Sequence, residues 1–247
     1  MKTFRTMLKT ELKLSLRGMD MLIFAICMPA VVLVLLGLIY GSKPAFEGAG
    51  YTFLAQSFGA VSTIAICAGG LMGLPLVVSD YRNRKILKRF KVTPVSPMMI
   101  LLVQVTIYSL YSLVSLVLIT AIVILFFDFA ITGSVLLFIA AFLLVMVSMF
   151  SIGMMVGGIA PNIKIASILA SILYFPMLIF SGATLPYEVM PKMLQNIADF
   201  LPLTQGIKLL KAVSLGLTID NIIFPLILMA AITCVCSAIS IKCFKWE

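Results

Sequence analysis

The chain has 247 residues, of which 62% are hydrophobic and only 11% are charged, and it carries a formal net charge of +9. Because soluble domains contain roughly a quarter charged residues, this composition excludes a soluble protein and predicts an integral membrane protein. The basic residues cluster beside long apolar runs, where they set membrane topology and meet anionic lipid, so membrane lipid rather than nucleic acid is the expected partner.

Residues 1–20 are predicted to form an amphipathic helix. Four basic residues recur at every fourth position and form one stripe on that helix: Arg5, Lys9, Lys13 and Arg17. Apolar residues cover much of another face: Phe4, Met7, Leu8, Leu12 and Leu16. This pattern is typical of a helix that lies in the cytoplasmic membrane interface. The alternative is a plain basic flank that only orients the first span.

A helix needs about 20 apolar residues to cross a bilayer, and the chain has six apolar runs long enough to do so. They cover residues 21–40, 54–78, 98–127, 134–156, 165–181 and 221–241. The second and fourth runs contain the glycine pairs Gly69/Gly73 and Gly153/Gly157, whose spacing permits close contact between helices. The prediction is therefore an all-α integral membrane protein, with residues 1–247 forming one transmembrane domain of six spans.

The basic residues also predict the orientation of the chain. Fourteen of the 18 fall in the N-terminal segment, residues 81–97, the turn 157–164 and the C-terminal tail, and four fall in the other three connections. Since positive residues accumulate on the cytoplasmic side, both termini are predicted to lie in the cytoplasm, with the protein in the plasma membrane.

The connection 81–97 reads YRNRKILKRFKVTPVSP and holds six basic residues. A charge at the centre of a spanning helix costs about 2.5–3.5 kcal/mol, so this segment must lie in water or at the headgroups. Ile86, Leu87 and Phe90 share one face of a helix that ends before Pro94. An apolar ridge rimmed by charge suits the groove of a partner protein. A loop that merely touches lipid headgroups is the alternative, and periodicity does not decide between them.

Residues 182–220 form the largest predicted segment outside the spans. Apolar residues between Val189 and Leu201 recur at intervals of three and four, which predicts an amphipathic helix. A second helix, 204–215, is too short and too charged to cross, with Lys208 and Lys211. Both helices are predicted to lie on the outer leaflet or dip into it as re-entrant helices, which requires burial in protein or a position lining a cavity.

Polar residues within the spans have two possible roles. The third span carries Gln104, Tyr108, Tyr111 and Ser115 on one stripe, and the fifth carries Ser167, Ser171 and Tyr174 on one face. Such faces serve either as hydrogen-bonding contacts between helices, which is the commoner case, or as part of a substrate path.

The sequence lacks the residues that several kinds of catalysis, metal binding and energy coupling require. The sequence has no histidine, which excludes histidine-based catalytic triads and HExxH metal sites. No charged residue lies near the middle of a predicted span, where ion-driven carriers place a coupling group. The chain also lacks a GxxxxGK[ST] loop. We therefore expect that this chain is not an enzyme and that it binds neither a metal nor a cofactor. If it transports a substrate, the energy must come from a partner protein.

Two stretches carry a family resemblance: LKRFKVTPVSP at 87–97, and the series SGATLP, MP and LPLT between Ser181 and Thr204. Together with the amphipathic N-terminus and the order of spans, they resemble the transmembrane subunits of type-two ATP-binding-cassette (ABC) exporters, which include drug and antimicrobial-peptide efflux permeases. The resemblance implies two permease subunits, of the same or different chains, bound to two cytoplasmic ATPase subunits that hold ATP and Mg²⁺.

The resemblance also implies roles for particular residues. The helix within 81–97 becomes a coupling helix that contacts the ATPase through Arg82, Arg84, Lys85, Ile86, Leu87, Lys88, Arg89, Phe90 and Lys91. The stripe Arg5, Lys9, Lys13 and Arg17 belongs to a connecting helix at the same surface. The resemblance places the transport path at the interface between the two permease subunits, chiefly between spans 2 and 5. The candidate path residues are Phe58, Ser62, Ser171, Tyr174, Phe175 and Leu178. Many relatives carry an acidic pair before the basic helix, whereas here only Asp80 is acidic and Asn83 is neutral; an acid–base contact at position 83 is thus not expected.

The resulting hypothesis is an ATP-driven exporter that moves an amphiphilic drug, antimicrobial peptide or lipid-like molecule out of the cytoplasm or inner leaflet. An ion-coupled secondary carrier and a non-transporting membrane scaffold or regulator are the alternatives. Transport that survives ATP depletion but not an uncoupler would favour the carrier, and a chain that binds no ATPase would favour the scaffold.

Overall fold

The computed structural model describes residues 2–41, 43–45, 50–86, 96–127, 132–181, 187, 190–217 and 222–243. Within these ranges the regular structure is helical, apart from one isolated bridge between Pro44 and Thr52. The predicted all-α fold class is confirmed.

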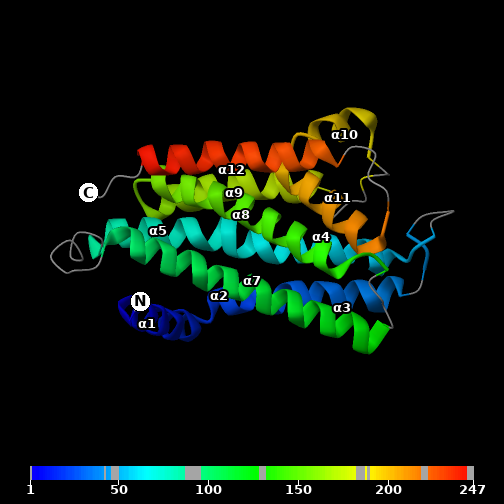
Figure 1. Cartoon of the computed structure of the whole chain (residues 1–247), viewed down its shortest axis with the longest axis horizontal. Coiled ribbons are helices and arrows are strands. Elements are labelled where there is room, and N and C mark those ends of the chain that lie inside the picture. The colour runs from blue at the N-terminus through cyan, green and yellow to red at the C-terminus, as the bar shows by residue number, and fades with distance from the viewer. Residues whose placement is uncertain are drawn as a thin grey trace.

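Six helices in the described ranges are long and apolar enough to cross a membrane, which agrees with the six predicted spans. They are η1–α3 (Ile23–Cys27 and Met28–Tyr40), α4–η2–α5 (Phe53–Cys67, Ala68–Gly73 and Leu74–Asn83), α7 (Pro97–Phe127), α8 (Val135–Ile159), α9 (Ile163–Phe180) and α12 (Ile223–Cys243). The segments η1 and η2 are π-helical turns within longer helices. Figure 1 shows the long helices side by side, with the N-terminal helix and the end of α12 at one end of the bundle. We call this end the basic end, because the N-terminal helix carries Arg5, Lys9, Lys13 and Arg17 and the last turn of α12 carries Lys242.

The N-terminal helix α1 spans Lys2–Gly18 and is followed by the short helix α2 (Asp20–Leu22). Met19 separates them with a φ of +53°, so the chain changes direction before the first span. Phe4, Met7 and Leu8 pack against the core, whereas the predicted basic stripe is exposed. The amphipathic helix is confirmed, and its position in a membrane interface stays a prediction.

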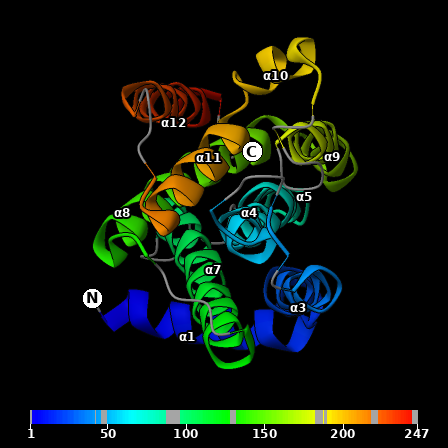
Figure 2. The same cartoon turned by 90° about the vertical axis from the view of Figure 1, so that its right-hand side faces the viewer.

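The second span lies in the interior of the bundle. Its most apolar window is 78% buried, whereas the corresponding windows of the first, third, fifth and sixth spans are at most 28% buried. Figure 2 shows α4 and α5 inside a ring that includes α3, α7, α11 and α9. Helix α8 packs along η2 and α5.

Glycines allow this close approach of α8 to η2. A β-carbon added to Gly153 would lie 1.9 Å from the carbonyl oxygen of Gly70, so the two backbones are in direct contact. A β-carbon on Gly69 would lie 3.5 Å from the Tyr108 side chain and 3.7 Å from the Ser112 hydroxyl oxygen, both ordinary contacts with α7. The glycine that approaches α8 most closely is therefore Gly70, and not a member of the predicted Gly69/Gly73 pair.

The segment between the fifth and sixth spans contains two helices, as predicted. Helix α10 covers Lys192–Ala198, and α11 covers Pro202–Leu215. Helix α11 packs between α4 and α8, with most of its residues buried. It ends at Gly216, whose φ of +66° closes the helix in the left-handed conformation. Its burial meets one requirement of a re-entrant helix, and its depth in a membrane stays a prediction.

Candidate functional site at the basic end

The described part of the basic connection begins as an extension of the second span. Arg82 lies in the last turn of α5, which ends at Asn83, and Lys85 has a φ of +56°. Helical geometry resumes at Ile86. The prediction of one continuous coupling helix from Arg82 to Lys91 is therefore wrong in its first residues, because the helix of the second span continues to Asn83 and the chain turns at Arg84 and Lys85. The other predicted coupling residues lie outside the described residues: Leu87, Lys88, Arg89, Phe90 and Lys91.

The guanidinium group of Arg82 binds the C-terminal end of α8. Its Nη1 donates to the carbonyl of Ala160 at 2.8 Å, and its Nη2 donates to the carbonyls of Gly157 at 2.9 Å and Gly158 at 2.8 Å. The last carbonyls of a helix have no partner in the helix and carry partial negative charge, so a cation stabilises them. Arg82 thus joins the end of the second span to the end of the fourth.

The neighbouring basic residues behave differently from Arg82. Arg84 forms an ion pair with Asp80 at 2.8 Å, but its side chain is 68% exposed. Lys85 is also exposed, and Ile86 is half-buried. These three residues present the surface that leads into the rest of the predicted coupling segment.

A second set of contacts, which we call the α1 cluster, joins α1 to the second and third spans. It consists of Glu11, Tyr81 and Gln104. The Tyr81 hydroxyl donates to Glu11 Oε2 at 2.5 Å. Gln104 Nε2 donates to the same carboxylate oxygen at 3.0 Å and to the Tyr81 hydroxyl at 3.0 Å. Three helices that begin far apart in the sequence therefore meet at one carboxylate.

A further hydrogen bond joins α1 to the third span. The Tyr111 hydroxyl donates to Ser15 Oγ at 2.7 Å. Gln104 and Tyr111 belong to the polar stripe of the third span, for which the sequence allowed either contacts between helices or a substrate path. In the structure both residues form hydrogen bonds with α1. Sequence analysis did not single out Glu11. The sequence feature that could have predicted its role is the position of this acidic residue, between Leu8 and Leu12 on the otherwise apolar face of α1.

Removal of the Glu11 carboxylate is expected to loosen α1. Hydrogen bonds to charged groups contribute about 1.5–3 kcal/mol, so Glu11→Ala should raise amide hydrogen exchange in α1 about tenfold or more. Thr10→Ala is the matched control, since the exposed Thr10 hydroxyl donates only to the carbonyl of Thr6 within the same helix. Exchange in Glu11→Ala equal to that in Thr10→Ala would show that the α1 cluster does not hold the helix.

The six predicted path residues do not share one face of the subunit. Phe58 and Ser62 are fully buried, and the Phe58 ring stacks on Phe138 of α8 with centroids 5.4 Å apart. Phe175 on α9 is 51% exposed, with its ring centroid 5.6 Å from that of Tyr174. The remaining path residues, Ser171 and Leu178, are half-buried. Within one subunit, Phe58 and Ser62 are thus core residues, and a role for any of the six in transport stays a prediction.

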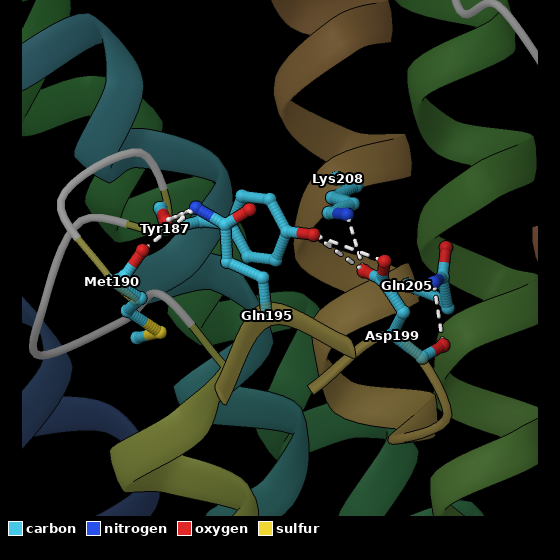
Figure 3. Close-up of polar contacts among 6 residues, drawn as sticks. All are labelled: Tyr187, Met190, Gln195, Asp199, Gln205 and Lys208. Atoms are coloured by element: carbon cyan, nitrogen blue, oxygen red, sulfur yellow. Dashed lines mark hydrogen bonds and ion pairs between the residues drawn. The ribbon is translucent and has the colours of Figure 1, made fainter. Parts of the chain in front are cut away.

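Sequence analysis also did not identify a polar cluster at the other end of the bundle, which we call the Tyr187 cluster (Figure 3). The Tyr187 hydroxyl donates to both carboxylate oxygens of Asp199, at 2.9 and 3.0 Å. Lys208 Nζ lies 2.6 Å from Asp199 Oδ1 and 3.6 Å from the centroid of the Tyr187 ring. Burial raises the pKa of the Tyr187 hydroxyl and favours its neutral, donating form.

The Tyr187 cluster orders the chain around α10. Gln195 donates to the carbonyls of Tyr187 and Met190, at 3.0 and 2.9 Å, and Gln205 donates to the carbonyl of Asp199 at 2.7 Å. These bonds fix α10 and the residues before it onto the start of α11. Among the described residues, no group of three or more histidine, cysteine or acidic side chains is arranged to hold a metal ion.

Comparison with known proteins identifies the family to which this architecture belongs. The family model described as ABC-2 type transporter matches residues 2–215. Over 72 residues the chain is 38% identical to "Nodulation protein J" of Rhizobium leguminosarum bv. viciae and 35% identical to "Nodulation protein J" of Neorhizobium galegae. Each of these matches covers 29% of this chain and 28% of the relative. No solved structure shows a significant match. Because the family model covers most of the six-span chain, the protein belongs to the ABC-2 type transporter family.

Proposed function

We propose that this chain is the permease subunit of an ATP-driven exporter that moves an amphiphilic substrate out of the cytoplasm or the inner leaflet. The observation that carries this proposal is the arrangement of contacts at the basic end. The α1 cluster joins α1, α5 and α7, and Arg82 joins α5 to α8. A force applied to the connection after Asn83 would therefore reach three spans and the N-terminal helix together.

The proposed cycle begins outside this chain. Two partner ATPase subunits bind ATP and Mg²⁺ and close, and their closure displaces the segment 84–91 and the exposed basic stripe of α1. A second permease subunit faces this one, and the movement reshapes the space between the two. In this proposal the basic end is cytoplasmic, and the Tyr187 cluster lies on the opposite side of the plasma membrane.

The coupling role can be tested with Ile86→Asp combined with Phe90→Asp, which replaces two of the three residues of the predicted apolar ridge while retaining all the basic residues. We expect co-purification of the ATPase and permease-stimulated ATP hydrolysis to fall at least tenfold. The matched control is Leu217→Asp with Ile222→Asp, which replaces two exposed apolar residues at the other end of the bundle.

Three results would contradict the proposal. ATPase binding and stimulated hydrolysis that remain intact in the Ile86/Phe90 variant would show that this segment does not couple the subunits. Transport that continues after ATP depletion and stops with an uncoupler would identify an ion-coupled carrier. A wild-type chain that binds no ATPase would identify a scaffold or regulator.

A further inference from the structure

The first two spans each contain a π-helical turn, η1 or η2, and both turns are closed by the same kind of hydrogen bond. The amide after each turn donates to the carbonyl five residues before it, whereas a regular α-helix uses the carbonyl four residues before. These bonds join Met28 to Ile23 and Leu74 to Gly69. Within the described residues, the third to sixth spans contain no π-helical turn. The feature is therefore particular to the first two spans.

A proline accounts for each turn. Pro29 and Pro75 each lie two residues after the last residue of the turn. A proline within a helix has no amide hydrogen, and its ring clashes with the carbonyl four residues before it, which belongs to Ala25 in η1 and to Leu71 in η2. Widening the turn moves this carbonyl away from the ring. Because helices bend sharply at prolines and π turns, these are the points at which both spans can bend.

The two turns pack against each other and against α7, so they lie at the same level of the bundle. Ala25 and Leu71 are fully buried at this level. A β-carbon on Gly73 would lie 2.5 Å from the Tyr108 ring and 2.8 Å from the Met21 sulfur, so the missing side chain allows close packing around η2. Since both spans are interrupted at one level, neither holds the other straight.

The parts of the first two spans on each side of the turns are joined separately. Figure 1 shows α1 and α5 toward the basic end and α3 and α4 toward the opposite end. Toward the basic end, Tyr81 of α5 donates to Glu11 of α1. Toward the opposite end, α3 packs along α4, and the rings of Tyr40 and Phe53 lie 4.3 Å apart. The two spans thus consist of two joined pairs that meet at η1 and η2, beside the uninterrupted helices α7 and α8.

A buried hydroxyl beside η2 has no hydrogen-bond partner among the described residues. Ser112 of α7 is fully buried, and its Oγ lies 3.7 Å from the position of a β-carbon on Gly69. A buried donor without a partner destabilises the packed state. In membrane proteins, serine hydroxyls of neighbouring helices bind backbone carbonyls that are released where a helix is interrupted. Ser112 is therefore placed to donate to a carbonyl of η2 when that turn opens.

We propose that η1 and η2 form a single hinge, at which α3 and α4 bend as a unit relative to α1, α2 and α5. Ser112 stabilises the bent state by donating to a carbonyl released from η2, and the structure shows the state in which Ser112 is unpaired. In the proposed exporter, on which only the purpose of this hinge rests, a displacement at the basic end would thereby move α4 with its candidate path residues Phe58 and Ser62.

The first test measures amide hydrogen exchange of the full chain in lipid nanodiscs, by mass spectrometry at single-residue resolution and relative to intrinsic rates. Bending breaks hydrogen bonds in the turns, so we expect amides of η2 to exchange at least tenfold faster than those of residues 58–63 in α4. Five of the six residues of η2 and all of residues 58–63 are buried, so burial alone would give equal rates. Equal protection of the two stretches would overturn the proposal. Because no ATPase is present, this result is independent of the proposed function.

Ser112→Ala distinguishes a hinge from a turn that is merely weakly bonded. If Ser112 stabilises the bent state, its loss should slow exchange in η2 about fivefold, the effect of one hydrogen bond, without lowering the thermal unfolding midpoint. Ser115→Ala is the matched control, because it removes another buried hydroxyl without a partner, three residues further along α7, and should leave exchange in η2 unchanged. Exchange in η2 that is the same in Ser112→Ala and Ser115→Ala would overturn the proposal.

Pro75→Ala tests the cause of the hinge. The new amide can donate to the carbonyl of Leu71, so exchange in η2 should slow at least fivefold. Pro176→Ala is the matched control, since Pro176 lies inside α9, which has no π turn, and this variant should exchange in η2 as the wild type does. A folded Pro75→Ala chain whose η2 exchanges as fast as that of the wild type would also overturn the proposal.

Discussion

Gly153→Ala is expected to separate α8 from the second span and to yield little folded protein. The added β-carbon would lie 1.9 Å from the carbonyl oxygen and 2.9 Å from the carbonyl carbon of Gly70. Both are backbone atoms, so no side-chain rotation relieves the overlap and the helices must move apart. Overpacking typically lowers the free energy of unfolding by about 1–3 kcal/mol. Because this clash is between the backbones of two packed helices, we expect a loss of about 3 kcal/mol or more.

The measurement is the yield of monodisperse protein in detergent together with its thermal unfolding midpoint. Gly69→Ala is the matched control, because it makes the same change one residue from Gly70 and the added β-carbon approaches no atom closer than 3.5 Å, a side-chain carbon of Tyr108. We expect this variant to match the wild type in both measurements. A normal midpoint for Gly153→Ala would show that α8 and η2 are not in backbone contact.

Arg82→Gln is expected to lower the free energy of unfolding by about 3 kcal/mol. The substitution removes the cation and the donors that bind the carbonyls of Gly157, Gly158 and Ala160. Each hydrogen bond to a charged group contributes about 1.5–3 kcal/mol when buried. Because Arg82 is only partly buried and the three bonds share one side chain, their contributions do not add fully.

Two further variants test whether geometry or charge alone supports the end of α8. Arg82→Lys keeps the charge but lacks the planar fork of donors, so it should recover only part of the lost stability. Arg84→Gln removes an exposed ion pair and should cost under about 1 kcal/mol. The measurement is unfolding in mixed detergent micelles, and equal stabilities for Arg82→Gln and Arg84→Gln would contradict the assignment.

The spans and α1 were predictable because their signals are local. Each span is an apolar run of sufficient length, and the stripe from Arg5 to Arg17 repeats every four residues. Membrane burial imposes this pattern directly on neighbouring residues, so no knowledge of the tertiary structure is needed. The same reasoning predicted a non-spanning helix at 204–215, because that segment is too short and too charged to cross, and α11 covers Pro202–Leu215.

The roles of Glu11 and Arg82 were not predictable, because their partners are distant in the sequence. Glu11 meets Tyr81 and Gln104, which lie 70 and 93 residues away. Arg82 was grouped with the other basic residues of its segment, although its carbonyl partners lie 75 to 78 residues away on α8. Composition shows that a cluster of charge must leave the hydrocarbon, but it does not show which member serves as a helix cap.

The π-helical turn at Ala68–Gly73 affects how positions along the second span can be compared. A π turn holds about one residue more than an α turn, and each residue rotates the side-chain direction by about 100°. A single helical wheel drawn from Phe53 to Asn83 therefore assigns residues before and after the turn to inconsistent faces. Two wheels are needed, one ending at Cys67 and one starting at Leu74, when substitutions in this helix are sorted into those that face α8 and those that face α3.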